Sequence, residues 1–519
     1  MVAVIDFFDR GWAGAPDAAA FIAGDETWSY DRAGRLSCRI ANALLAPGGF
    51  PGTKVAVLAP NSPTAWICVL GIWRAGGVWV PLHPDNPADD NARLMQRFDV
   101  DLLFYAPELA EQVESIRSQT RTLDLVALGG APNSDPVLSD WLADASELRP
   151  EVPYEMDDTV MIASTGGTTG EPKGVMNTHR SMSAMVAHQL LALRYDAGDD
   201  IVNLAAAPMT HTAGILTLQT SARGGTVVIL PRAAVEEILT AIEKHGVTEL
   251  FLPPTVVYRL LAAHQERPRD TSSLRYLLYG AAPMSVEKLR QGIAALGPVF
   301  TEGYGQMEAP AAISFLTPAE HLEGGEPATD ARLSSCGRPF PLVTITVRDV
   351  DTDAALPAGE TGEICVRGDL VMKGYYKAPE QTAEALRDGW LRTGDLGHLD
   401  ADGYLHLTDR KKDVIISGGF NVYPSQVEQV IWSHPAVEDC VVVGAPDDDW
   451  GERVVAVVEL LPGDSATAEE LLASCRAALG AVRTPKELRF VDRLPRSVNG
   501  KVLKSEVRAE FWAGLNRAI

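Results

Sequence analysis

The chain alternates short, continuously apolar runs with longer stretches in which apolar residues recur at helical spacing. This alternation occupies residues 54–82 and returns over residues 226–280. The predicted strands are 54–60, 77–82, 226–231, 247–254 and 275–280, and the predicted helices are 62–76, 233–244 and 255–265. Strands that are apolar throughout are typical of sheets covered on both faces. The pattern therefore predicts a layered α/β body.

The pattern changes near residue 404. Two short predicted strands flank the charged cluster Asp409–Asp413, and Pro424 begins a helix, where its missing N–H costs little. The remaining predicted elements are strands at 437–443 and 453–460 and helices at 467–479 and at the C-terminus. We therefore expect a boundary within 408–412, with an α/β body over residues 1–408 and a small α+β domain over residues 409–519.

The charge of the chain excludes one broad class of function. Its 519 residues include 45 Lys and Arg against 69 Asp and Glu, a formal charge of −24. Residues 410–519 carry 14 basic and 16 acidic side chains, so almost all of the excess lies on the body. A nucleic-acid-binding surface needs clustered Lys and Arg to neutralise phosphates. We therefore expect no nucleic-acid partner.

Cysteine usage and apolar stretches indicate the cellular compartment. Six scattered cysteines without a CxxC pair argue against a disulfide framework or a zinc site. The longest apolar stretch, Ala65–Leu82, contains Arg74 and Pro81, so it is too short and too interrupted to cross a bilayer. Asp6 and Asp9 interrupt the N-terminus where a signal peptide needs an apolar core. We expect a cytoplasmic protein with no integral membrane segment.

The strongest local motif is Ser164–Gly174, with the sequence STGGTTGEPKG. It follows an apolar run and precedes a helix that is expected to begin near Thr178. Glycine N–H groups, hydroxyls and a lysine suit phosphate binding, and the residues concerned are Thr165, Gly166, Gly167, Thr168, Thr169, Gly170 and Lys173. A flexible linker is the plain alternative. A Walker A loop is rejected, because Lys173 is followed by glycine rather than by Ser or Thr.

Further motifs follow this loop in a fixed order. They are Ala207–Gly214 (APMTHTAG), Tyr279–Met284 (YGAAPM), Glu302–Glu308 (EGYGQME), Gly362–Gly368 (GEICVRG), Trp390–Asp395 (WLRTGD), Asp409–Asp413 (DRKKD) and Pro495–Lys501 (PRSVNGK). Over nearly the whole chain, the set resembles that of the adenylate-forming enzymes, which comprise acyl- and aryl-CoA synthetases, luciferases and peptide-synthetase adenylation domains. The resemblance is greatest to bacterial fatty- and aryl-acid–CoA ligases. It implies a large α/β N-terminal domain of layered subdomains and a small, mobile α+β C-terminal domain.

The resemblance also assigns a nucleotide site. Besides the Gly-rich loop, the residues implied are Gly280, Ala281, Ala282, Gly303, Tyr304, Gly305, Asp395 and Arg410. Tyr304 would stack on adenine, and Asp395, beside Arg410, would accept hydrogen bonds from the ribose hydroxyls. Glu308 is the expected Mg²⁺ ligand, because hard cations prefer carboxylate oxygens. Taken alone, Tyr304 would be interpreted as a core residue, Asp395 as a turn former and Glu308 as a solvated acid.

Catalytic and acceptor-binding roles follow from the same resemblance. Lys501 would lie between the substrate carboxylate and the α-phosphate, Lys412 would form the hinge, and His211 would border the acyl pocket. Gly418 and Gly419 would line a narrow tunnel for the pantetheine arm of coenzyme A. The plain alternatives are a surface lysine for Lys501, a helix cap for His211 and a hairpin turn for the two glycines.

Two positions depart from the usual pattern of the family. Gly166 stands where many relatives have Ser, and Met307 stands where many have a Thr that contacts phosphate. Because Met307 cannot donate a hydrogen bond, we expect Thr301 or a backbone group to replace that contact.

The resemblance implies a ligase that uses ATP, Mg²⁺ and coenzyme A to convert a carboxylic acid to acyl-AMP and then to acyl-CoA. The motif around His211 contains no acidic residue, which disfavours a free amino acid as substrate. The pocket candidates are His211, Ala213, Gly280, Gly303 and Ala309, and their mostly small side chains favour a bulky apolar or aromatic acid. The alternatives are transfer to an amine or a carrier protein, luciferase chemistry, and a non-enzymatic nucleotide-binding regulator. A homodimer is left open.

Overall fold

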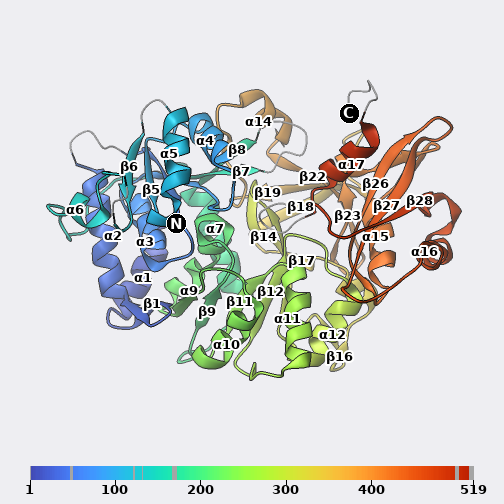
Figure 1. Cartoon of the computed structure of the whole chain (residues 1–519), viewed down its shortest axis with the longest axis horizontal. Coiled ribbons are helices and arrows are strands. Elements are labelled where there is room, and N and C mark those ends of the chain that lie inside the picture. Colours follow the sequence, from blue (N-terminus) through green and yellow to red (C-terminus); the bar gives the residue numbers. More distant parts are fainter. Residues whose placement is uncertain are drawn as a thin grey trace.

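A computed structural model describes residues 2–46, 51–120, 123–130, 133–165, 172–496 and 502–513, leaving aside the side chains at positions 211, 212 and 312. Figure 1 shows a large body that holds most of the chain and a smaller unit at one end, formed by the C-terminal elements. The body contains two large sheets and a smaller antiparallel sheet.

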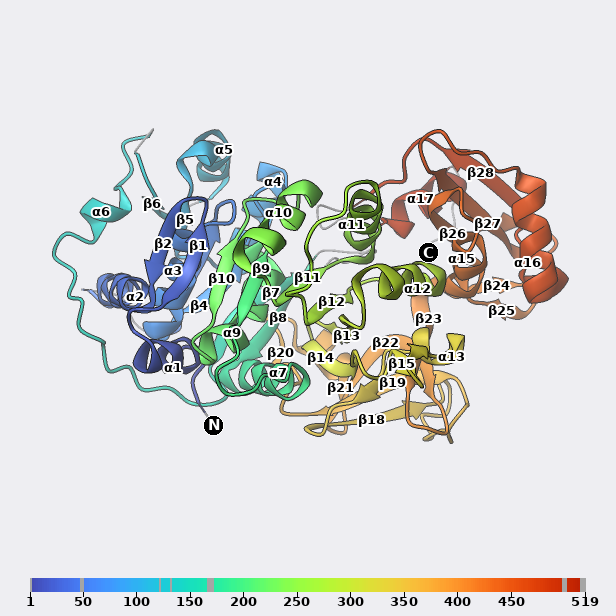
Figure 2. The ribbon, with the colours of Figure 1, turned by 90° about the horizontal axis from the view of Figure 1, so that it is seen from below.

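The first large sheet has nine strands, parallel in the centre and antiparallel at both edges. Its order is β17 (Arg338–Pro339), β14 (Ala309–Leu316), β13 (Phe300–Gln306), β12 (Tyr276–Gly280), β11 (Glu249–Leu252), β9 (Val202–Ala205), β10 (Thr226–Ile229), β1 (Ala19–Ala23) and β2 (Glu26–Ser29). One face packs against α10 (Val235–His245), α11 (Pro254–Glu266) and α12 (Val286–Leu296). Figure 2 shows these three helices beside one another.

The second large sheet has seven strands. Its order is β20 (Gly374–Tyr375), β8 (Lys173–Thr178), β7 (Thr159–Thr165), β4 (Val78–Pro81), β3 (Lys54–Leu58), β5 (Leu102–Tyr105) and β6 (Asp124–Ala127). One face of this sheet is covered by α4 (Ala88–Arg97) and α5 (Ala110–Gln119). On the other face Val55, Val57 and Phe104 join the main hydrophobic core, so both faces are apolar, as the uninterrupted strands of the sequence predict.

A layer of helices separates the two sheets and contributes to the main hydrophobic core. It contains α1 (Asp6–Gly14), α2 (Tyr30–Leu44), α3 (Pro63–Arg74), α7 (His179–Ala192) and α9 (Leu218–Ala222). Helix α3 contacts strands of both sheets. Its Trp66 and Trp73 pack edge-to-face with each other and with Trp79 of β4, with ring centroids 5.6–5.9 Å apart.

The third sheet links the body to the C-terminal unit. It contains β18 (Val343–Arg348), β19 (Gly362–Gly368), β22 (Trp390–Leu399), β21 (Leu386–Arg387) and β23 (Leu405–Arg410). Short elements of the body are η1 (Pro107–Leu109), α6 (Leu138–Trp141), η2 (Met209–Ala213), α8 (Gly214–Leu216), β15 (Leu322–Glu323), β16 (Glu326–Pro327), α13 (Asp330–Leu333) and α14 (Pro379–Ala385).

The C-terminal unit has its own sheet and its own hydrophobic clusters. The strands are β24 (Ile415–Ser417), β25 (Phe420–Val422), β26 (Val437–Asp447), β27 (Gly451–Leu460) and β28 (Glu487–Val491). The helices are η3 (Lys411–Asp413), α15 (Pro424–Trp432), α16 (Ala468–Arg483) and α17 (Lys504–Trp512). The strands on the two sides of 408–412 thus belong to different sheets, and the domain boundary there remains our prediction.

The predicted fold class is confirmed. The helix expected near Thr178 is α7, which begins at His179, and it is preceded by a strand that was not predicted, β8 over Lys173–Thr178. Strand β8 pairs antiparallel with β7. Among the described residues, no helix is long and apolar enough to span a membrane.

Candidate active site

The Gly-rich motif connects two antiparallel strands. Strand β7 ends at Thr165, which is paired with Lys173 at the start of β8. The predicted phosphate ligands Gly166, Gly167, Thr168, Thr169 and Gly170 lie outside the described residues. The Lys173 ammonium lies 4.7 Å from the centroid of the Tyr375 ring, a cation–π contact with β20. The structure thus places the motif's lysine at one end of the loop and against an aromatic face.

Tyr375 connects Lys173 to the expected metal ligand. Its hydroxyl donates a hydrogen bond of 2.9 Å to Oε1 of Glu308, a carboxylate that is only 9% exposed. Burial and the neighbouring Glu308 raise the pKa of Tyr375, so the phenol remains a donor. Within the described ranges, no group donates to Oε2 of Glu308, so this oxygen is available to a further ligand.

The predicted adenine turn lies at the carboxyl ends of two neighbouring parallel strands. Gly280 of β12 is paired with Gly303 of β13, and a Cβ atom at position 280 would lie only 2.4 Å from the Gly303 carbonyl oxygen. Ala281 follows with a positive φ of 67°, and Ala281 and Ala282 are both exposed. Such strand ends are where open α/β sheets bind ligands. The two backbones approach so closely that a side chain at 280 is excluded.

The buried Tyr304 and Asp395 form one group with the exposed Arg410. The Tyr304 hydroxyl donates a 2.7 Å hydrogen bond to Oδ2 of Asp395, and Nε of Arg410 lies 3.2 Å from Oδ1. Asp395 and Arg410 are paired across β22 and β23, which fixes their separation. Burial and the Asp395 carboxylate raise the pKa of Tyr304 well above its usual value. Asp395 thus has a neutral donor at Oδ2 and a cation beside Oδ1.

Glu363 is a neighbour of this group to which the sequence assigned no role. It lies on β19 inside a predicted motif, and its Oε1 accepts a 3.2 Å hydrogen bond from the backbone N–H of Gly394. Its Oε2 is 3.5 Å from the ammonium of Lys411. Glu363 therefore supports the turn before Asp395 and tethers the start of η3. Tyr375 was also missed, because it is 67 positions from its partner Glu308 and no spacing rule connects them.

His211 lies in the single π-turn η2, the kind of helical irregularity that is frequent at functional sites. It is the third residue of this turn, whose N-cap is Pro208, and because its side chain lies outside the described part, both interpretations of His211 stay predictions. The turn is fixed from both sides. The Met209 N–H donates 2.7 Å to Oδ1 of Asn61, and the Thr210 hydroxyl donates 3.1 Å to the Leu82 carbonyl.

The residues predicted for the hinge and tunnel lie next to each other in the chain. Lys412 lies in η3, is exposed, and is within electrostatic range of Asp395 and Lys173. Gly418 and Gly419 have φ angles of 58° and 81° and join β24 to β25, so they do form a hairpin turn. The catalytic candidate Lys501 lies outside the described residues.

Met307, which stands where many relatives have Thr, is held by packing and by a backbone hydrogen bond. Its side chain packs against the main hydrophobic core, and its carbonyl accepts a 3.2 Å hydrogen bond from Nδ2 of the buried Asn177. Thr301, expected as a replacement donor, is 1% exposed, and its hydroxyl has no hydrogen-bond partner among the described residues. The donor that replaces the usual Thr therefore remains a prediction.

Comparison with known proteins identifies the family of this chain. The family model described as AMP-binding enzyme matches residues 8–376, and the AMP-binding enzyme C-terminal domain matches residues 426–501. A feruloyl-CoA synthase from Amycolatopsis sp is 37% identical over 96% of each chain. The medium/long-chain-fatty-acid–CoA ligase FadD8 of Mycobacterium tuberculosis is 35% identical over 94% of this chain and 86% of the other.

The solved structures agree. The amide bond synthetase McbA from Marinactinospora thermotolerans superposes with a TM-score of 0.88 at 32% identity, covering 98% of this chain and 100% of the other. ATP-bound MatB from Rhodopseudomonas palustris gives a TM-score of 0.87 at 30% identity, with 99% and 100% covered. The chain thus belongs to the AMP-binding enzyme family and has the two-part fold of the adenylate-forming superfamily.

Proposed function

We propose that this protein is an AMP-forming acid–CoA ligase. The observation that carries the proposal is the convergence of two contact groups, Lys173–Tyr375–Glu308 and Tyr304–Asp395–Arg410, in a chain whose whole length matches CoA ligases. The charge of Arg410 is influenced by both Asp395 and Glu308, so the two groups share one electrostatic environment. Lys173 offers a cation for the phosphates, Glu308 offers a carboxylate for a metal, and Asp395 offers a carboxylate for the ribose.

In the first half-reaction, the carboxylate oxygen of the acid attacks the α-phosphate, and pyrophosphate leaves. ATP carries several negative charges, so a carboxylate can approach only when they are screened. We assign this screening to Thr165, the loop 166–170 and Lys173 around the phosphates. Tyr304 offers its ring to adenine on the turn formed by 280–282 and 303–305, and Asp395 accepts from the ribose hydroxyls. We assign to Lys501 the position between the substrate carboxylate and the α-phosphate.

Glu308 suits Mg²⁺ as the single protein ligand. No cluster of three or more His, Cys, Asp or Glu side chains that could hold a metal occurs in the described part of the chain. A metal here would therefore complete its coordination with phosphate oxygens and water, as Mg²⁺ does at nucleotide sites. When bound, it would neutralise phosphate charge. Tyr375 orients the carboxylate by occupying Oε1, which leaves Oε2 for the metal.

In the second half-reaction, the thiol of coenzyme A attacks the acyl carbonyl carbon, and AMP leaves. We propose that residues 409–519 turn about Lys412 between the two steps, because a single site must exclude water first and admit a thiol later. The tight Gly418–Gly419 turn would then border the thiol's path. Trp450 supports this assignment, since it packs so closely on Gly418 that a Cβ atom there would lie 2.4 Å from its ring.

We propose a bulky apolar or aromatic acid as substrate. Ala213 and Ala309 are buried, and like Gly280 and Gly303 they have a small side chain or none; His211 of η2 would border the acid. Relatives that act on such acids, among them a feruloyl-CoA synthase and an indoleacetate–CoA ligase, support this class.

Two other acyl acceptors are alternatives to coenzyme A. One of the most similar solved structures is an amide bond synthetase, and one relative, 33% identical, is a fatty acid–[acyl-carrier-protein] ligase. An amine or a carrier protein could therefore take the acyl group from the same adenylate. Coenzyme A is favoured because relatives named as CoA ligases match this chain with up to 37% identity.

The proposal is tested by measuring pyrophosphate release from ATP and Mg²⁺ with ferulate, indoleacetate, octanoate and palmitate. The best acid is then incubated with coenzyme A or with a panel of amines, and the product is identified by mass. A CoA thioester supports the ligase, whereas an amide formed in preference would replace it by the second function. The absence of pyrophosphate release with every acid class would contradict both.

Lys501→Ala tests the assigned catalytic lysine. We expect acyl-adenylate formation to be lost, while thioester formation from supplied acyl-AMP largely survives, because only the first step develops charge between carboxylate and phosphate. Lys244→Ala, on the outer helix α10, is a control that should leave both steps unchanged. Equal loss of both half-reactions in Lys501→Ala would contradict the assignment.

A further inference from the structure

The turn η2 lies where the two large sheets of the body meet. The chain that follows β3 and β4 contacts it from the second sheet, and the chain that follows β9 leads into it from the first sheet. Strands β3 and β4 are parallel to each other, as are β9 and β10. Open α/β sheets bind their ligands beside the carboxyl ends of such strands. The groups that fix η2 therefore bear on the acid that the proposed function places beside this turn.

One side chain, that of Asn61, connects the ends of three strands. Its amide nitrogen donates hydrogen bonds to the carbonyl oxygens of Ala207, at 2.9 Å, and Leu230, at 3.0 Å, which follow β9 and β10. Its Oδ1 accepts a 2.7 Å hydrogen bond from the N–H of Met209, the first residue of η2. Both N–H groups of the amide and its oxygen are thus used on backbone groups. Asn61 therefore ties the end of β3 to the ends of β9 and β10 and to the start of η2.

The start of α3 holds Asn61 in place. Ser62 is the N-cap of this helix and Pro63 is its first residue, so the backbone that follows Asn61 is fixed. One turn further along α3, Trp66 is 1% exposed and lies against the residue that follows η2, because a Cβ atom at Gly214 would lie only 2.2 Å from its ring. The same short segment of chain thus contacts η2 at both of its ends.

A second side-chain contact attaches η2 to the strand beside β3. The hydroxyl of Thr210, which is 1% exposed, donates a 3.1 Å hydrogen bond to the Leu82 carbonyl at the end of β4. The turn itself is a single π-turn of five residues, closed by a 3.3 Å bond from the Ala213 N–H to the Pro208 carbonyl. Because so short a turn makes few backbone bonds of its own, its position depends on the side chains that attach it to both sheets.

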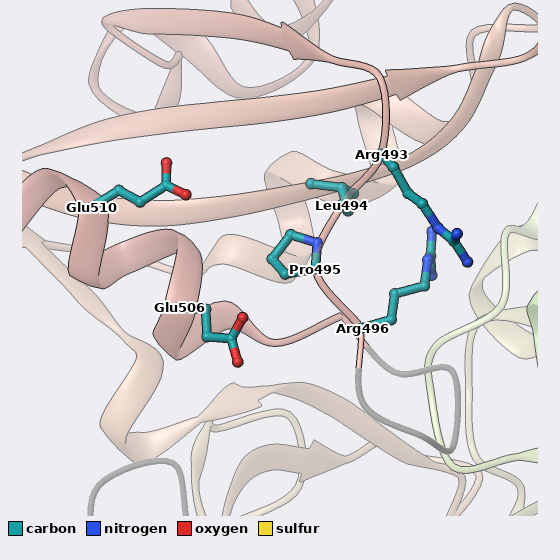
Figure 3. Close-up of a pocket in the computed structure, with 6 residues that line it drawn as sticks. All are labelled: Arg493, Leu494, Pro495, Arg496, Glu506 and Glu510. Carbon is teal, nitrogen blue, oxygen red and sulfur yellow. The ribbon is translucent and has the colours of Figure 1, made fainter. Parts of the chain in front are cut away.

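A cavity in the C-terminal unit does not suit an apolar acid. It has a volume of about 470 Å³ and lies between residues 493–496 and α17, as Figure 3 shows. Four of the six side chains that line it are charged, namely Arg493, Arg496, Glu506 and Glu510. Apolar and aromatic ligands are bound mainly by apolar side chains, with only a few polar groups. The selection of the acid therefore belongs to the body, beside η2.

We propose that Asn61 is a positioning residue for acid binding. By holding η2 at the junction of the two sheets, Asn61 sets the position of one wall of the acid-binding site. This role rests on the proposed function, in which η2 borders the acid. The groups assigned to the nucleotide lie on other strands, β12, β13, β22 and β23, so the affinity for ATP should not depend on Asn61.

The test measures the first half-reaction in the full-length protein. Pyrophosphate release is followed with the best acid of the screen, while the concentration of either the acid or ATP is varied. For Asn61→Ala we expect the KM for the acid to rise about tenfold or more, because three backbone groups lose their partner and η2 is released. The KM for ATP should stay within about twofold. Since the second half-reaction is not involved, the result does not depend on the identity of the acyl acceptor.

Two further variants complete the design. Thr210→Val removes the hydrogen bond to the Leu82 carbonyl while keeping the size of the side chain, and should raise the KM for the acid about threefold or more, again without a matching rise for ATP. Asn42→Ala is the matched control. Asn42 of α2 also donates to two backbone carbonyls, those of Ser146 and Leu148, but makes no contact with η2. Both KM values should therefore stay unchanged in Asn42→Ala.

An unchanged KM for the acid in Asn61→Ala, or an equal rise of both KM values, would overturn the inference. Should Asn61→Ala fail to fold, the same two outcomes in Thr210→Val decide. The wild-type protein separates these results from a failure of the proposed function. If it releases pyrophosphate with an acid whose KM the variants leave unchanged, only the positioning role is wrong. If it activates no acid, the proposed function is wrong and the positioning role with it.

Discussion

A buried carboxyl beneath the predicted adenine turn should make the stability of the body depend on pH. Glu302 lies on β13, next to Gly303, with Oε2 3.4 Å from the Tyr279 hydroxyl and Oε1 3.6 Å from Sγ of Cys336. Burial raises the pKa of Glu302 to about 8, against a usual value of 4.5, and the Cys336 and Tyr279 contacts only partly offset this. Glu302 is therefore protonated at neutral pH in the folded protein.

The neighbouring groups accommodate a neutral Glu302. Burial lowers the pKa of His321 to about 4, so its ring is neutral. Its Nδ1 lies 2.8 Å from the Thr317 carbonyl and must donate to it, which leaves Nε2 to accept from the Tyr279 hydroxyl at 2.9 Å. Because Tyr279 donates its proton to His321, it cannot also donate to Glu302. Instead, the protonated carboxyl of Glu302 donates to the phenol oxygen of Tyr279. In Glu302→Gln, the side-chain amide can take over this donation without changing the shape of the site.

The sign of the effect follows from proton binding. Above pH 4.5 the unfolded chain releases the Glu302 proton, whereas the folded chain holds it up to about pH 8, so the folded state binds more protons in this window. Stability should then fall by about 1.4 kcal/mol per pH unit between these limits. At pH 7 the cost is about 3 kcal/mol, which Glu302→Gln removes. At about 2.1 cal/mol/K per residue, this raises the Tm of a body of roughly 400 residues by about 4 °C.

The assay is thermal unfolding of both proteins from pH 5 to pH 8 at one scan rate. We expect the Tm difference to be small at pH 5 and to grow in favour of Glu302→Gln up to pH 8. A difference that does not change with pH, or a wild-type protein that is more stable at pH 8, would refute the reasoning, because Glu302 would then already be ionised in the folded state.

Two further variants address the nucleotide turn and the hinge. In Gly280→Ala the new methyl group would lie 2.4 Å from the Gly303 carbonyl oxygen, so we expect the KM for ATP to rise about tenfold or more. Gly14→Ala, whose Cβ meets nothing within 4 Å, is the control. An unchanged KM in Gly280→Ala would contradict the close approach. Lys412→Pro fixes φ within η3. We expect its pyrophosphate release to stay within about threefold of the wild-type rate, while thioester formation slows at least tenfold. Equal effects on both steps would reject the hinge.

Some site contacts could be predicted from the sequence because they follow local rules. Asp395 and Arg410 lie on adjacent strands of a single antiparallel pair, and the motifs that contain them indicate that they are neighbours. Gly280 is required by the close approach of two adjacent parallel strands, and its motif marks that position. The strand β8 was missed because Lys173–Thr178 is short and only partly alternating, and periodicity over six residues does not separate a strand from the approach to a helix.

By itself, the sequence determined the layered α/β class, the ordered set of motifs and the adenylate-forming family, since apolar runs and motif spacing are properties of neighbouring residues. Only the tertiary structure decided which side chains meet. Tyr304 bonds to Asp395 across 91 positions, Tyr375 joins Lys173 to Glu308, and Lys504 pairs with the buried Glu428. These contacts form between elements that packing brings together from distant parts of the chain, and no local pattern specifies which partner a buried charge will find.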